Sequence, residues 1–125
     1  MNSRFDIINA SAGSGKTFAL TKRILIKILK SKDENYFKRI LALTFTNRAA
    51  AEMKSRVLNN LKDFSEIQIK DSPTEMFEQV KKELAFSREQ IIILAKERLN
   101  LLLHNYSFFQ IETLDSFNHH IVRSF

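Results

Sequence analysis

The distribution of glycine is the feature that most constrains how this chain folds. Only two of the 125 residues are glycine, Gly13 and Gly15, whereas average usage of about 7% would give roughly nine. Both lie in the segment Ala-Ser-Ala-Gly-Ser-Gly-Lys-Thr at 10–17. Because glycine has no side chain, it lets another group approach the backbone closely. We therefore expect this one loop to be where the backbone meets a ligand.

The sequences on either side of the loop predict a strand and a helix. Phe-Asp-Ile-Ile-Asn at 5–9 has the composition of a short buried strand, and 17–30 carries apolar residues at helical spacing. A glycine loop in this setting that ends in Lys-Thr is a Walker A sequence. Backbone N–H groups would bind phosphate oxygens, Lys16 would reach the β- and γ-phosphates, and the Thr17 hydroxyl would bind Mg²⁺. The alternative is a Gly/Ser turn that happens to end in Lys-Thr.

Two further apolar segments predict strands. Residues 39–45 form a continuous apolar run, typical of a strand buried on both faces of a parallel sheet. Thr46 or Asn47 can cap the helix that follows, and 107–114 returns to strand character. Strand, helix and strand make a βαβ unit. The predicted fold class is therefore α/β, with parallel strands and flanking helices.

Residues 65–106 are predicted to form a helical insertion in this fold. Two capping boxes, Ser-Pro-Thr-Glu at 72–75 and Ser-Arg-Glu-Gln at 87–90, predict helices over 73–86 and 88–104. Their apolar residues recur at three- and four-residue spacing, so we assign them to packing and not to chemistry.

Composition excludes several classes of function. The absence of Cys rules out disulfides and thiolate metal sites, and three His make a His-rich metal site improbable. The apolar runs are too short to span a bilayer, and the N-terminus lacks a signal-peptide core, so we expect a cytoplasmic protein with no membrane partner. Residues 1–62 carry 13 basic and 4 acidic side chains, against 7 and 10 in 63–125. Because residues 1–62 carry the excess of positive charge, we expect an anionic partner to bind this half of the chain.

Three segments resemble motifs I, Ia and Ic of the UvrD/Rep-type superfamily 1 helicases. They are Ala-Ser-Ala-Gly-Ser-Gly-Lys-Thr-Phe at 10–18, Ala-Leu-Thr-Phe-Thr-Asn-Arg-Ala-Ala-Ala-Glu-Met at 42–53 and Thr-Leu-Asp-Ser-Phe at 113–117. The Thr-Phe-Thr-Asn block is highly specific to that superfamily. The Ala-Ser-Ala-Gly opening is most similar to the RecB/AddA branch, which comprises helicase-nuclease subunits of double-strand-break processing.

The resemblance implies a fold, two cofactors and two sets of site residues. Residues 1–125 would be the N-terminal part of motor domain 1A, an incomplete RecA-like P-loop NTPase domain, and a helicase-nuclease partner subunit is possible. The ATP- and Mg²⁺-binding residues would be Ala12, Gly13, Ser14, Gly15, Lys16 and Thr17, with Lys16 and Thr17 as the catalytic candidates. Phe45, Thr46, Asn47, Thr113 and Ser116 would contact single-stranded DNA. The alternatives are a core position for Phe45 and helix capping for Thr46, Asn47 and Ser116.

Catalysis requires groups that the sequence does not supply. Hydrolysis of ATP needs an apolar strand ending in Asp-Glu and an arginine that stabilises developing charge. The only Asp-Glu pair, at 33–34, lies in a polar connector. We therefore expect the isolated chain to bind nucleotide without hydrolysing it or unwinding DNA. A stand-alone nucleotide- or nucleic-acid-binding module and a P-loop kinase are the other hypotheses.

Overall fold

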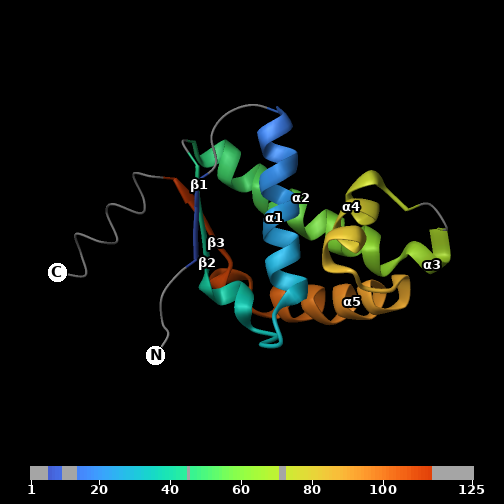
Figure 1. Cartoon of the computed structure of the whole chain (residues 1–125). Helices are drawn as coiled ribbons and strands as arrows, with labels where there is room; N and C mark the ends of the chain where they lie inside the picture. Colours follow the sequence, from blue (N-terminus) through green and yellow to red (C-terminus); the bar gives the residue numbers. More distant parts are fainter. Residues whose placement is uncertain (1–5, 10–13, 45, 71–72, 114–125) are drawn as a thin grey trace.

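The structure of the protein is a computed structural model of the whole chain, and residues 6–9, 14–44, 46–70 and 73–113 are described (Figure 1). Secondary structure covers most of these residues. In chain order the elements are β1 (Asp6–Asn9), α1 (Ser14–Lys30), η1 (Tyr36–Arg39), β2 (Ile40–Thr44), α2 (Asn47–Ser65), α3 (Ile67–Lys70), α4 (Glu75–Leu84), α5 (Arg88–His104), η2 (Tyr106–Phe108) and β3 (Gln110–Thr113), where η denotes a 3₁₀ helix.

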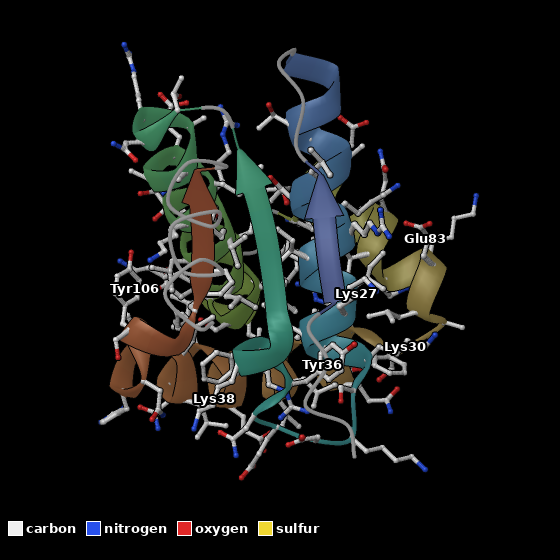
Figure 2. The ribbon with its side chains drawn as sticks, turned by 90° about the vertical axis from the view of Figure 1, so that its left-hand side faces the viewer. Lys27, Lys30, Tyr36, Lys38, Glu83 and Tyr106 are labelled. Atoms are coloured by element: carbon white, nitrogen blue, oxygen red, sulfur yellow. The ribbon has the colours of Figure 1, made fainter. Side chains whose placement is uncertain are left out.

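The three strands form one parallel sheet in the order β1-β2-β3. Each lies within a segment whose sequence predicts a strand. In the register, Asn9 is opposite Leu43, and Thr44 is opposite Thr113. These are the last residue pairs between neighbouring strands. Because the strands are parallel, all three end at the same edge of the sheet, as the arrows in Figure 2 show.

Helices α1 and α2 supply the centre of the hydrophobic core. The i, i+1, i+4, i+5 row of α1 places four fully buried side chains on one face, Ile24, Leu25, Ile28 and Leu29. Helix α2 has an apolar face at three- and four-residue spacing, and its four members are all buried: Ala50, Met53, Val57 and Leu61. Burial of each large apolar side chain stabilises the fold by roughly 1.5–3 kcal/mol.

Helices α4 and α5 begin at side-chain caps. The capping box of α5 is confirmed: the Gln90 N–H donates to Ser87 Oγ at 3.2 Å, and the Ser87 N–H donates to Gln90 Oε1 at 2.9 Å. Helix α4 begins at Glu75, two residues later than predicted. The reason is that Thr74 is its N-cap and accepts the Phe77 N–H at 3.1 Å.

The predicted fold class, an α/β RecA-like domain with flanking helices, is wrong for the described part of the chain. Its α-helices hold 17, 19, 4, 10 and 17 residues, whereas its strands hold only 4, 5 and 4. With the strands seen edge-on in Figure 1, every labelled helix lies on the same side of the sheet. The unit is therefore mainly helical, with a small sheet along one side.

The position of the 65–106 segment explains this outcome. The Phe64 ring of α2 and the Phe77 ring of α4 meet edge to face, with centroids 5.3 Å apart. Ile91, Ile92 and Leu102 of α5 are buried in the same cluster as the α1 and α2 residues. The added helices thus enlarge one helical core and do not form a second layer across the sheet.

Candidate functional site

The glycine loop joins the end of β1 to the start of α1. Strand β1 ends at Asn9 and helix α1 begins at Ser14, so the helix follows the strand after a four-residue connection. Ala12 and Gly13 lie outside the described residues. The other residues proposed for phosphate binding form the first turn of α1: Ser14, Gly15, Lys16 and Thr17.

The first turn of α1 has the electrostatics of an anion site. It carries no acidic side chain, and the first N–H groups of a helix lack partners within the helix and lie at its positive end. The Thr21 hydroxyl donates to the Thr17 carbonyl at 2.8 Å and approaches Met53 Sδ of α2 at 3.4 Å. Thr21 is buried, so the turn that contains Thr17 is anchored to the helix core.

The second motif occupies the start of α2. Thr46 is the N-cap of this helix, and its hydroxyl accepts the Ala49 N–H at 3.0 Å, so the helix-capping alternative is confirmed for Thr46. Asn47 is the first residue of α2, and its side chain is exposed. Phe45 lies outside the described residues. The first turn of α2 is also free of acidic side chains.

Of the third motif, only Thr113 is among the described residues. Thr113 is the last residue of β3 and is opposite Thr44, the last residue of β2. Ser116 lies outside the described residues. The last residues of β2 and β3 are thus neighbours at one edge of the sheet, and α2 begins three residues after β2. Strand β1 ends at the same edge, and α1 is the next element along the chain.

The only Asp-Glu pair lies at the other end of α1. Asp33 and Glu34 are exposed in the turn after α1, where Asp33 Oδ1 accepts the Asn35 N–H at 3.0 Å. A 17-residue helix is about 25 Å long, so this pair is remote from Lys16. Within the described ranges, no three His, Asp or Glu side chains form a group that could hold a metal ion.

Sequence reasoning missed one buried charged residue. Arg98 of α5 is only 4% exposed. Its Nε donates to the Ile28 carbonyl at 3.1 Å, its Nη2 donates to the Ser31 carbonyl at 2.8 Å, and its Nη1 pairs with Glu97. Burial lowers the pKa of Arg98, while Glu34 and Asp33 act in the opposite direction. The available signal was its spacing, since Arg98 falls on the helical row of the buried Ala95 and Leu102.

The sequence profile of the UvrD/REP helicase N-terminal domain matches residues 4–125. The chain belongs to this helicase family. The match spans all three motif segments and the helical residues 65–106 between the second and third of them. Among the described residues of this UvrD/REP helicase domain, no helix has the length and apolar character needed to cross a bilayer.

The curated relatives of this helicase domain are ATP-dependent helicase/nuclease subunits A. The protein from Exiguobacterium sibiricum is 35% identical over 100 residues, which cover 80% of this chain and 8% of the relative. The protein from Bacillus mycoides is 46% identical over 56 residues, which cover 45% of this chain and 4% of the relative. The protein from Latilactobacillus sakei is 47% identical over 60 residues, which cover 48% of this chain and 6% of the relative. The chain thus spans less than a tenth of these relatives. No solved structure matches it.

Proposed function

We propose that this chain is the ATP-binding N-terminal portion of an ATP-dependent DNA helicase of the helicase-nuclease kind, which acts in double-strand-break repair. The observation that carries the proposal is the start of α1: Lys16 and Thr17 lie in its first turn, directly after a parallel strand and a glycine loop. Membership of the UvrD/REP family and similarity to ATP-dependent helicase/nuclease subunits A support the same activity.

In this proposal the triphosphate binds at the start of α1. The loop and helix-start N–H groups donate to phosphate oxygens, as helix N-termini do for anions in general. The Lys16 ammonium neutralises the β- and γ-phosphates, and the Thr17 hydroxyl is a ligand of Mg²⁺. The residues assigned to ATP binding remain those of the Walker A sequence, Ala12, Gly13, Ser14, Gly15, Lys16 and Thr17.

Single-stranded DNA is proposed to cross the same edge of the sheet. The assigned contacts are Phe45, Thr46, Asn47, Thr113 and Ser116. Small hydroxyl and amide groups at helix starts bind a phosphate backbone without reading its sequence, and an aromatic ring such as that of Phe45 supplies a surface on which a base stacks. The Thr46 hydroxyl caps α2 by accepting a backbone N–H, and we assign it to DNA contact as well, because a hydroxyl has one donor and two acceptor sites.

We assign the whole chain, 1–125, to the N-terminal part of motor domain 1A and 65–106 to an insertion within it. The parent protein would act with a partner subunit. The isolated chain is proposed to bind nucleotide without turnover, because the remote Asp33–Glu34 pair offers no acidic group near Lys16.

Nucleotide binding by the Lys16→Ala variant tests the proposal. Titration calorimetry with ATP and Mg²⁺ is expected to show at least a tenfold loss of affinity in Lys16→Ala, since the phosphates lose their point charge. Lys62→Ala is the matched control, because it removes an equal charge from an exposed position in the last turn of α2. Circular dichroism should be the same for all three proteins. Equal ATP binding by wild type and Lys16→Ala would overturn the assignment.

A further inference from the structure

A basic site lies along the second half of α1, away from the first turn of that helix. A pocket of about 690 Å³ lies between α1, the start of η1 and α4, a size typical of ligand sites. Its charged and aromatic lining residues are Lys22, Arg23, Lys27, Lys30, Tyr36 and Glu83. Figure 2 shows Lys27, Lys30 and Tyr36 together beside the edge strand β1, with Glu83 on the same side. Among the described residues, four cations and one carboxylate line this pocket.

Helix geometry arranges three of these cations in a row. Arg23, Lys27 and Lys30 occupy positions i, i+4 and i+7 of α1, so they share one face. At 1.5 Å per residue the row is roughly 10 Å long. Phosphates of a strand with duplex-like stacking follow one another at about 3.4 Å of axis, so this row spans about three phosphates of a stacked strand and fewer of an extended one.

The fourth cation is held in place by α4. Lys22 Nζ donates to Gln79 Oε1 at 3.0 Å and pairs with Glu83 Oε2 at 3.1 Å. The Lys22 and Glu83 side chains are 25% and 50% exposed, so both groups are accessible from the pocket. The site therefore includes a fixed ammonium and an adjacent carboxylate that opposes anion binding.

A purely structural role does not account for all four cations. Lys27 and Lys30 lie in the last turn of α1, where cations offset the negative end of the helix dipole. That effect is confined to the last turn, and Lys22 joins α1 to α4 through Gln79 and Glu83. Neither role accounts for Arg23, which is exposed upstream of the last turn. A membrane surface is disfavoured as the ligand, because the large exposed apolar side chains of the described residues, Ile69, Ile93, Leu103 and Tyr106, do not line the pocket.

We propose that this pocket binds single-stranded DNA as a second contact, separate from the motif edge. The row of cations on α1 binds successive phosphates, and the Tyr36 ring, together with Ile26, provides the apolar wall for a base. A cationic groove with an aromatic side chain is the usual design of sequence-independent single-strand sites. This inference does not rest on the proposed ATP site.

The test measures binding of a fluorescent oligothymidylate to the 125-residue chain by anisotropy, with nucleotide and Mg²⁺ absent. The variant Arg23→Gln/Lys30→Gln removes two exposed cations of the pocket. Its Kd is expected to rise by about fivefold or more, and the plot of log affinity against log salt should become shallower by about 1.4, or about 0.7 for each lost phosphate contact. Glu83→Gln is expected to lower the Kd, because it removes the opposing carboxylate.

The matched control is Lys62→Gln/Lys96→Gln, which removes the same charge from exposed positions on α2 and α5. Its Kd should change by less than about twofold. An equal loss of DNA affinity in both double variants would show that binding reflects overall charge, and it would overturn the site. An unchanged Kd in the pocket variant would also overturn it. Binding of inorganic tripolyphosphate tests whether the pocket recognises a free phosphate compound and not the DNA backbone. Pocket-dependent binding of tripolyphosphate without pocket-dependent binding of DNA would refute the nucleic-acid assignment.

The same variants separate this inference from the proposed function. The pocket variant should bind ATP with Mg²⁺ as wild type does, and Lys16→Ala should retain the effect of Arg23→Gln/Lys30→Gln on DNA binding. If only the ATP-binding experiment fails, the proposed function is overturned and the DNA site at the pocket stands. If only the DNA experiment fails, the DNA site is overturned and the proposed function stands.

Discussion

Replacement of Arg98 by methionine is expected to destabilise the protein by about 3 kcal/mol. The guanidinium of this buried side chain donates to two carbonyls at the end of α1, those of Ile28 and Ser31. The Ile28 carbonyl is one of the last four of α1, which lack hydrogen-bond partners within a helix. Ser31 directly follows the helix. Methionine reaches only about as far as the Nε of arginine and has no donor, so Arg98→Met leaves both acceptors without this partner.

The magnitude follows from three contributions. Hydrogen bonds to a charged group contribute about 1.5–3 kcal/mol each, so two of them contribute about 3–6 kcal/mol. Removal of a buried charge recovers part of its desolvation cost. Glu97, the ion-pair partner, has a side chain that is 46% exposed, so it stays hydrated when Arg98 is lost and adds little. The net loss is thus about 3 kcal/mol.

Urea unfolding followed by circular dichroism measures this loss. With an m value of about 1–3 kcal/mol/M, the midpoint for Arg98→Met should fall by roughly 1–3 M. Lys96→Met is the control, because it removes a cation from an exposed position of the same helix and should cost less than about 0.5 kcal/mol. If Arg98→Met also cost less than about 1 kcal/mol, the contacts between Arg98 and α1 would not hold these helices together.

Two smaller predictions concern the ends of α4 and α5. Ser87→Ala removes the cap that accepts the Gln90 N–H and should lower the unfolding free energy by about 1 kcal/mol. Ser87→Asp keeps an acceptor and should retain most of the wild-type stability. An equal loss of stability in both variants would contradict a capping role. Ala85 ends α4 with φ of 55°, a left-handed conformation that costs a non-glycine residue about 1–2 kcal/mol. Ala85→Gly should therefore raise the Tm by a few degrees, and a lower Tm would show that the conformation carries no such cost.

The correction of the fold class shows where sequence patterns are insufficient. Strand patterns at 5–9, 39–45 and 107–114 correspond to β1, β2 and β3, but they do not specify which side of the sheet the helices cover. That choice depends on contacts such as the ring pair of Phe64 and Phe77, which joins α2 to α4. Periodicity identifies an apolar face but not its partner.

The sequence by itself determined the local features of this protein. The glycine loop, the caps of α2 and α5 and the apolar face of α2 depend on residues within one or two helical turns of each other, and the three motifs resembled the family that the profile confirms. Tertiary structure alone decided the rest. It brought Arg98 to the end of α1, and it placed Glu83 beside the cations of the same helix. Those contacts join residues more than 50 positions apart, and their energies become favourable only when packing of the helices has already fixed the two backbones.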